Sequence, residues 1–406
     1  AAGRALVGEE RGALALRSAL VALQVAVSVM LLTGAALVGQ SLGRLLAVDP
    51  GFEPAGRWSG RIAISGSAYR PAERAAFFEE VARRVSALPG VERAGLVNRL
   101  PLAPSASCDS FVLGDRPLPE PGAEDCAEER VADAGYFATL GMRVDAGRAL
   151  DERDRDGSAP VVVVNRAMAE RYWPGASPLG RTFKWGDAGS EDPWREVVGV
   201  VEDVRHFGLA AAAEPEVYMP IAQQPWSEEY HLVASAAVAP RTITPAVREV
   251  VRKLDPTVAV DDVATMRERI AGSVAPERLR TAVLGLFAGV ALAMTVLGLF
   301  GVMSQTVTRR AREVGLRLAL GAARSAVLAL VMRQGLALLL AGIGLGLAGA
   351  LAARRALGGL LFGVEAGDPR TLAGGVVLVA VVAGLAILLP ALRSLRVDPA
   401  VTLREE

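Results

Sequence analysis

The stretch TAVLGLFAGVALAMTVLGLFGVMSQTVT, residues 281–308, decides the fold of this chain because it contains no ionisable side chain. At a rise of about 1.5 Å per residue, a helix of this length crosses the ~30 Å hydrocarbon core of a bilayer. Three further intervals, 18–43, 334–353 and 371–392, lack ionisable side chains in the same way. We therefore predict four transmembrane helices.

Two other structures could hold such apolar segments. A large soluble protein could bury them as core helices, but core helices usually keep a polar stripe, and these segments do not. The first segment could be a cleaved signal peptide. Its apolar run, 19–38, is longer than the ~7–15 residues of a signal-peptide core and has no clear A-x-A site before Arg44. An uncleaved membrane helix is the better interpretation.

Arginine placement predicts the orientation, since positively charged flanks stay in the cytoplasm. Three arginines precede the first helix, and six lie between Arg309 and Arg333 in the gap after the second. Both termini are therefore expected inside, although two arginines in the 354–370 link dilute the signal. The predicted order is cytoplasmic 1–16, transmembrane 17–44, external 45–278, transmembrane 279–306, cytoplasmic 307–327, transmembrane 328–353, external 354–370, transmembrane 371–392 and cytoplasmic 393–406.

Composition and single residue types argue against several functions. The formal net charge is +0, so no global field attracts nucleic acid. Lysine occurs only at Lys184 and Lys253, so the chain has no G-x-x-x-x-G-K-[ST] motif and no P-loop ATPase of its own. The predicted helices also lack the ionisable residues that ion-coupled carriers usually place near the midplane. Energy, if used, must come from another protein.

The chain's two cysteines, Cys108 and Cys126, both fall in the predicted external domain. In an oxidising periplasm two cysteines that close a short loop are expected to form a disulfide. Two unrelated thiols are the alternative. A zinc site is a poor fit, because the spacing to His206 and His231 resembles no zinc motif.

The external domain is predicted to be mixed α/β. A helix at 71–88 is opened by Pro71, and Phe77, Val81 and Val85 recur at a spacing of four, which gives one buried face. Strands and helices alternate, so a two-part α/β domain is favoured over a β-sandwich. The other expected elements are strands at 58–65, 91–97, 161–164, 197–204 and 230–238, helices at 167–172 and 245–254, and a Pro-rich loop at 101–129.

Small residues in the third predicted helix match a nucleotide-binding pattern without its context. Gly344, Gly346 and Gly349 fit G-x-G-x-x-G, but no strand precedes them, as the dinucleotide motif requires. Glycines at Gly342, Gly346 and Gly349 are better explained by the close approach of another helix. We predict a helix-packing face there.

Two further patterns in the external domain are interpreted as structural. The segment 152–157 resembles the start of a calcium loop, but Val163 stands where a bidentate glutamate is needed. His206 lies near Asp203 in sequence, which could suggest acid–base chemistry, but no partnered nucleophile is evident. Neither a metal site nor a catalytic site is predicted.

The cytoplasmic segment TRRAREVGLRLALGA, residues 308–322, has helical spacing. Arg310, Glu313, Arg317 and Arg324 fall on one stripe, and Glu313 and Arg317 are placed for an i,i+4 pair. By pattern alone this could be an interfacial helix among anionic headgroups.

The same segment resembles a family signature. REVGLRLALGA, residues 312–322, is similar to the R-E-I-G-I-R-x-A-L-G-A motif of FtsX-like ABC-transporter permeases, whose topology of one helix, a large periplasmic domain and three helices also matches. The chain looks most like one half of a tandemly duplicated permease related to MacB. Stretches that resemble the MacB-type core, and the ending typical of the family, are VDPGF at 48–52, LPGV at 88–91, YFATLGM at 136–142, VN at 164–165, VGVVEDVR at 198–205 and RVDP at 396–399.

The resemblance implies a division of labour in a bacterial inner membrane. A separate cytoplasmic ABC ATPase, carrying ATP and Mg²⁺, would press on a coupling helix, and this chain would hold no cofactor. A second permease copy, or the other half of a longer chain, would complete the unit in the lipid bilayer, with a periplasmic adaptor as an optional partner. The residues that the resemblance assigns to the coupling site are Arg310, Arg312, Glu313, Gly315, Arg317 and Gly321.

Family members are thought to transmit mechanical movement instead of passing substrate through a membrane channel. Their tasks differ, from efflux to lipoprotein or peptide export and hydrolase activation, and the sequence selects none. The rival from another class is a membrane sensor or a scaffold that regulates periplasmic hydrolases. A membrane enzyme is more distant, because no nucleophile–base set stands out.

Overall fold

The structure is a computed structural model that describes residues 2–65, 69–102, 108–120, 122–309, 323–359 and 361–394. The chain forms two compact units. The helical unit comprises Ala1–Ala47 and Pro276–Glu406, and the second unit, the large domain, comprises Val48–Ala275.

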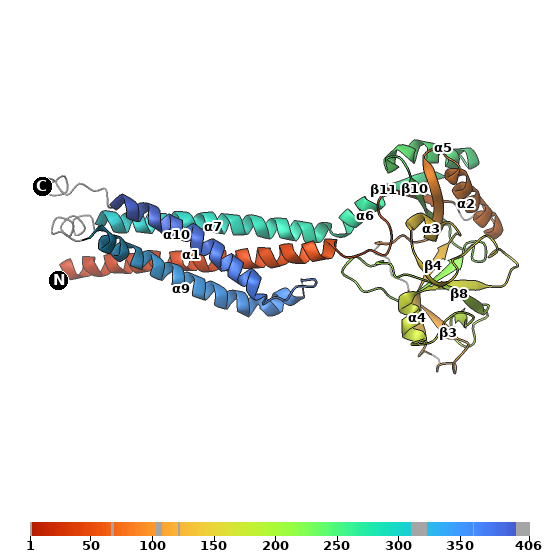
Figure 1. The fold of residues 1–406 in the computed structure, drawn as a ribbon, viewed down its shortest axis with the longest axis horizontal. Helices are drawn as coiled ribbons and strands as arrows, with labels where there is room; N and C mark the ends of the chain where they lie inside the picture. The colour runs from red at the N-terminus through yellow and green to blue at the C-terminus, as the bar shows by residue number, and fades with distance from the viewer. Residues whose placement is uncertain are drawn as a thin grey trace. The chain divides into compact units, whose positions relative to one another are not determined.

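The helical unit contains four long apolar helices among its described residues. They are α1 (Ala2–Leu46), α7 (Ala275–Arg309), α9 (Arg324–Gly358) and α10 (Pro369–Ser394) (Figure 1). Each includes a segment long and apolar enough to cross a bilayer, and α7 begins at Ala275, four residues before the predicted helix. The four predicted apolar helices are therefore present.

Aliphatic side chains at helical spacing hold these helices together. Val21, Val25 and Val29 recur every four residues along α1 and are buried. They pack in one cluster with Leu299 of α7 and Val379 of α10. A repeat of four keeps these valines on one face of α1, so that face points into the helical unit.

The first part of the large domain is a four-stranded sheet covered by helices, here called the α/β lobe. Its strands run in the order β11-β1-β10-β2, all antiparallel to their neighbours. Helices α2 and α5 pack against each other, and Phe78, Val81 and Val85 of α2 are fully buried (Figure 1). The pattern is a split β-α-β arrangement. Its elements are β1 (Arg57–Ala63), α2 (Pro71–Ser86), β2 (Val91–Val97), β10 (Glu229–Ala236), α5 (Thr244–Leu254), β11 (Ala259–Thr265) and α6 (Met266–Ser273).

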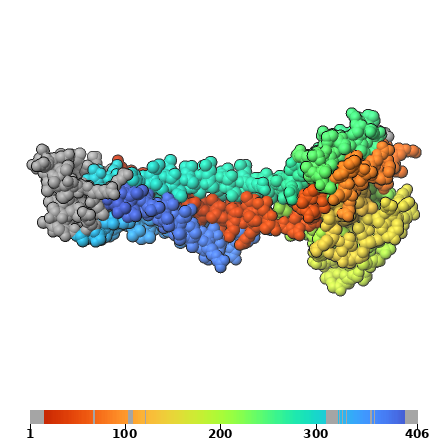
Figure 2. Space-filling view, turned by 45° about the horizontal axis from the view of Figure 1, so that its top comes forward, coloured from red at the N-terminus to blue at the C-terminus, as the bar shows by residue number. Residues whose placement is uncertain are grey.

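The second part, here called the barrel lobe, is inserted between β2 and β10. Its strands pair in the order β4-β3-β7-β8-β6-β9, and β9 pairs back with β4 in parallel, which closes a ring. Figure 2 shows this insertion in yellow beside the orange and green residues of the α/β lobe. Its elements are β3 (Cys108–Leu113), β4 (Asp125–Ala132), α3 (Tyr136–Leu140), β5 (Val144–Gly147), β6 (Val161–Asn165), α4 (Arg166–Tyr172), β7 (Thr182–Trp185), β8 (Arg195–Val201) and β9 (Glu216–Pro220).

The prediction of a mixed α/β domain is confirmed, but two of its segments were wrong. The region 101–129 is not one loop, because it contains β3 and the start of β4. Prolines at 117, 119 and 121 belong only to the connection between these strands. The strand predicted at 197–204 ends at Val201, because the backbone then leaves the sheet and bonds elsewhere: Arg205 N donates to Pro50 O at 3.0 Å.

Candidate functional site

The predicted coupling segment lies outside the described residues. Helix α7 ends at Arg309, and α9 begins at Arg324, so the segment connects these two helices. The residues concerned are Arg310, Arg312, Glu313, Gly315, Arg317 and Gly321. Their part in coupling stays a prediction.

The predicted packing glycines of α9 lie against α1. A Cβ added at Gly342 would lie 2.5 Å from Cβ of Val25, and one at Gly346 would lie 2.7 Å from the carbonyl oxygen of Ala26. At Gly349 the nearest atom would be Sδ of Met30, at 2.4 Å. At Gly342 and Gly346 a larger side chain would force the helices apart, because backbone atoms of α1 lie this close, whereas at Gly349 the flexible Met30 side chain could move.

Polar side chains join α1 to α7. Ser28 Oγ lies 2.8 Å from Thr295 Oγ1, and both residues are fully buried. Closer to the N-terminus of α1, Arg17 Nη1 donates to Gln305 Oε1 at 2.9 Å. These hydrogen bonds fix which residues of the two helices face each other.

The segment that follows α1 is anchored in the large domain by the VDPGF motif at 48–52. Gly51 has φ of +79°, and a Cβ there would lie 1.9 Å from the carbonyl oxygen of Asp203. Its N–H donates to Asp49 Oδ1 at 3.0 Å, and Phe52 is buried. Glycine is required at 51 for both reasons, its positive φ and the close backbone approach.

Two other motif stretches hold the same segment. Glu53 N donates to Leu140 O at 2.7 Å, which ties it to the YFATLGM stretch at the end of α3. Residues 203–205 of the VGVVEDVR stretch supply the contacts to Pro50 and Gly51. Three stretches that are far apart in sequence therefore meet where the chain enters the large domain.

The segment that leads out of the domain reaches the same core. Thr265 and Glu268 form a capping box that starts α6, and Met266 at its first turn is fully buried. Met266 belongs to the same hydrophobic cluster as Phe52 and Val204, and Ile270 packs against it. The segments that follow α1 and precede α7 thus share one buried cluster, here called the junction core.

A buried network of charges lies next to this junction core. Arg130 Nη1 is 3.1 Å from Glu128 Oε2, and Arg130 Nη2 is 3.2 Å from Glu216 Oε1. The same Glu216 oxygen lies 2.9 Å from His206 Nε2, and Tyr218 donates its hydroxyl to the other oxygen at 2.9 Å. All five side chains are buried, so each charge depends on its partners.

Electrostatics keep Glu216 ionised. Burial alone would raise the pKa of this carboxyl, but attraction to His206 and Arg130, together with its hydrogen bonds, holds the pKa below its usual value. Asp203, the sequence neighbour of His206, instead accepts a hydrogen bond from Ala167 N at 2.8 Å. The His206–Asp203 pair considered from sequence is therefore not formed, and His206 belongs to a structural ion network.

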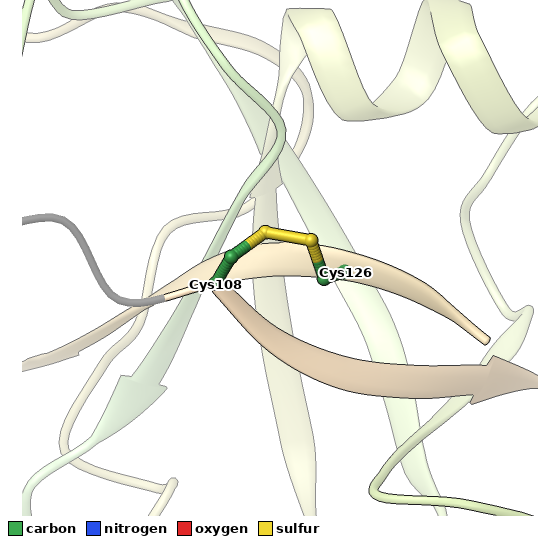
Figure 3. The surroundings of a disulfide bond; sticks show 2 residues. All are labelled: Cys108 and Cys126. Atoms are coloured by element: carbon green, nitrogen blue, oxygen red, sulfur yellow. A yellow bond between two sulfur atoms is a disulfide. The ribbon is translucent and has the colours of Figure 1, made fainter. Parts of the chain in front are cut away.

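Cys108 and Cys126 are joined as a disulfide across β3 and β4 (Figure 3). Their Cα atoms are 5.2 Å apart, within the usual range for a bonded pair. The bond links two strands that also pair along their backbones, from Cys108 opposite Glu128 to Phe111 opposite Asp125. It lies in the barrel lobe.

A cleft of about 640 Å³ lies between α2 and the loops that follow β4, β5 and β9. Three of its acidic side chains, Asp133, Asp151 and Asp154, already have partners. Burial raises the pKa of Asp133 to about 7, although this carboxylate accepts a hydrogen bond from Leu96 N at 2.9 Å. Asp154, in the 152–157 stretch, pairs with Arg148 at 2.7 Å. Within the part of the chain that the structure describes, no group of His, Cys, Asp or Glu is arranged to hold a metal ion.

Two family models match the chain and define its class. The MacB-like periplasmic core domain matches residues 18–268, and the FtsX-like permease C-terminal model matches residues 285–399. Together the two models span the first apolar helix, the large α/β domain and most of the three later helices, and they place the chain among ABC transporter permeases. The chain belongs to the MacB-like and FtsX-like permease family, and the resemblance found in its sequence is confirmed.

Curated relatives include permeases from several bacteria. The chain is 26% identical over 287 residues to the uncharacterized ABC transporter permease YknZ of Bacillus subtilis, a match that covers 67% of this chain and 68% of YknZ. It is 25% identical over 203 residues to the macrolide export ATP-binding/permease protein MacB of Aggregatibacter actinomycetemcomitans. That match covers 46% of this chain but only 29% of MacB.

Solved structures of two domains are also similar. The periplasmic region of MacB from Actinobacillus actinomycetemcomitans has a TM-score of 0.37 and 16% identity, over 55% of this chain and 95% of that one. The extracellular domain of YknZ has a TM-score of 0.33 and 15% identity, over 50% of this chain and all of that domain, 100%.

Proposed function

We propose that this chain is the permease subunit of an ABC transporter and that it transmits ATP-driven movement from a separate cytoplasmic ATPase to its periplasmic domain. Family membership supports the transporter class. This sequence contains no P-loop lysine motif, which supports the part of the proposal that gives ATP hydrolysis to a partner. The segment 310–322 would receive the movement from that partner, through the coupling residues named above.

The shared junction core is the observation that carries this proposal. Helix α1 ends at Leu46, and the anchored VDPGF segment begins two residues later. Helix α7 begins at Ala275, and α6, with buried Met266, ends two residues before it. A displacement of either helix end is therefore delivered by covalent continuity to one packed cluster, which transmits strain because protein interiors resist compression.

The charge network extends the junction core into the barrel lobe. Arg205 N bonds to Pro50 in the anchor, and the next residue, His206, contacts Glu216 on β9. Arg130 on β4 then joins Glu216 to Glu128. A movement at residue 50 thus has a rigid polar connection to the two parallel strands that close the barrel.

The remaining parts of the proposal follow from the family. The chain would lie in the bacterial inner membrane with both termini in the cytoplasm and the large domain in the periplasm. A second permease copy, or the other half of a longer chain, would complete the transporter. The task would be efflux or the export of lipoproteins or peptides, with a periplasmic adaptor as an optional partner.

Co-purification tests the proposal directly. The tagged chain is extracted from its native membrane in mild detergent, and the proteins that accompany it are identified. We expect an ABC ATPase with the wild type and its loss with Glu313→Arg. The matched control is Glu365→Arg, the same charge reversal in the link between α9 and α10, which should retain the ATPase.

Each outcome has a separate meaning. Loss of the ATPase in both variants would indicate misfolding and calls for a check of the extracted chain by size exclusion. Retention in both would contradict the assignment of the coupling segment. A folded wild-type chain without any ATPase would contradict the transporter proposal and favour a sensor or a scaffold for periplasmic hydrolases.

A further inference from the structure

Helices α1 and α7 face each other in one antiparallel register. Beside the aliphatic packing of Val21 and Leu299, four contacts between polar side chains or glycines mark it, within the apolar part of both helices. In order along α1, the pairs are Arg17–Gln305, Gln24–Gly298, Ser28–Thr295 and Gly39–Thr281.

Gln24 is the member of this series whose side-chain acceptor has no hydrogen-bond donor. Its Oε1 is buried and has no hydrogen-bond partner. It lies over Gly298, where an added Cβ would be only 2.4 Å from it. The apolar surroundings supply no water to replace the missing hydrogen bond. This register is therefore destabilised by a buried acceptor that has no donor.

One helical turn separates Gln24 from Ser28, the residue that does find a partner on α7. Residues four apart lie on the same face of a helix, and the distance between their levels is about 6 Å. If α1 slid by that amount toward its own C-terminus, Gln24 would come level with Thr295, whose hydroxyl can donate to Oε1.

After this shift, the Ser28 hydroxyl would still have a hydrogen-bond partner. Hydroxyls in a helix can donate to the carbonyl four residues earlier, as Thr33 does here to Val29 O at 2.8 Å. A glutamine on the same helix has no such local substitute.

We propose that α1 and α7 have two hydrogen-bonded registers one turn apart, with Thr295 bonded to Ser28 in the first and to Gln24 in the second. The two registers convert a gradual push into a discrete step of about 6 Å, a known kind of transition between packed helices. This inference rests on the proposed function for its driving force, which is ATP hydrolysis on a partner. Gln24 and Thr295 act as positioning residues and touch no substrate.

Disulfide cross-linking of the full chain in its native membrane distinguishes the registers. The chain's own two cysteines are already bonded to each other and do not interfere. Gly39→Cys with Thr281→Cys reports the first register, and Ala35→Cys, one turn earlier on α1, with Thr281→Cys reports the second, so that Gln24, Ser28 and Thr295 all stay in place. Ala36→Cys with Thr281→Cys is the control, because Ala36 neighbours Ala35 but is exposed.

Cross-linking yield is measured without nucleotide and with ATP plus vanadate. We expect the first pair to cross-link without nucleotide, and the second pair to exceed the control at least fivefold when ATP and vanadate are present. Gln24→Leu, in the first-pair background, should keep the first register under both conditions. A second pair that stays at the control level in both conditions, while the ATPase hydrolyses ATP normally, overturns the two-register proposal.

Failure of the proposed function gives a different result. If no ATPase accompanies the chain and nucleotide changes neither pair, the transporter proposal fails. The cross-linking yield without nucleotide then tests the two-register proposal. A yield of the second pair above the control supports two registers populated by thermal motion. A yield equal to the control overturns the proposal.

Discussion

Removal of the Arg130 guanidinium should cost the large domain a large part of its stability. Arg130 is 1% exposed and is the cation between Glu128 and Glu216, whose side chains are 5% and 2% exposed. The substitution Arg130→Met keeps an unbranched side chain but leaves two buried carboxylates without this partner. Breaking a buried ion pair by removing one member typically destabilises by about 3–5 kcal/mol.

Tryptophan fluorescence measures this loss in the full-length chain. All five tryptophans lie between residues 48 and 275, so urea unfolding in detergent micelles reports on the large domain. With a slope of about 2 kcal/mol per M urea, a loss of 4 kcal/mol lowers the unfolding midpoint by about 2 M. The slope itself should not change.

Arg83→Met is the matched control. Arg83 makes a comparable ion pair with Glu80, at 2.6 Å, but its side chain is 70% exposed. Exposed pairs contribute about 0–1 kcal/mol, so the midpoint should move by less than about 0.5 M. Equal effects of the two substitutions would refute the argument that burial makes the Arg130 network important. Glu128→Gln with Glu216→Gln, added to Arg130→Met, should recover part of the loss.

Three further predictions concern other parts of the chain. Replacing Cys108 and Cys126 together by alanine should cost about 3 kcal/mol in the same urea titration, from loop entropy, and an unchanged midpoint would contradict this. Gly346→Leu should lower the thermal stability of the helical unit, measured by circular dichroism in detergent, whereas Gly344→Leu, which meets open space, should not. Burial, then the charge of nearby Asp109, raises the pKa of Glu129 to about 7. The folded state therefore holds this proton where the unfolded state has released it, so stability should fall as pH rises from about 4 to 7. Glu129→Gln should make that fall smaller, and the part that remains comes from Asp133, whose pKa burial raises to about 7 in the same way.

The helical unit could be predicted from sequence because hydrocarbon imposes a simple requirement. A span without ionisable side chains has few alternatives to a membrane helix, and all four apolar helices are found. Gly342, Gly346 and Gly349 could also be singled out, since small residues on one helix face indicate close packing. Their partner could not, because nothing in α9 specifies Val25 and Ala26 on α1.

The large domain was predicted in class but not in topology. Strand β9, EVYMP at 216–220, is short, and all of its residues are buried. It therefore lacks the alternation of apolar and polar residues that identifies a strand in a sequence. Its parallel pairing with β4, which closes the barrel, depends on residues about ninety apart. Long-range pairing of this kind leaves no local periodicity.

The charge network was missed for a related reason. Glu128, Arg130, His206 and Glu216 look like ordinary surface residues when each is considered with its sequence neighbours. Only the fold brings them together in a buried position, where each charged group stabilises its neighbour. The VDPGF motif could be recognised as a unit, but its partner at residue 203 could be found only from the structure.

The barrel lobe begins and finishes on two neighbouring strands of the α/β lobe. Val97 at the end of β2 is paired with His231 near the start of β10, so the two ends of the insertion at 98–228 lie side by side. An insertion with adjacent ends can be exchanged without moving the scaffold that carries it. A chimaera could therefore replace this lobe at adjacent ends, but the new lobe would have to keep the contacts that Leu140, Asp203 and Val204 make with the segment that follows α1.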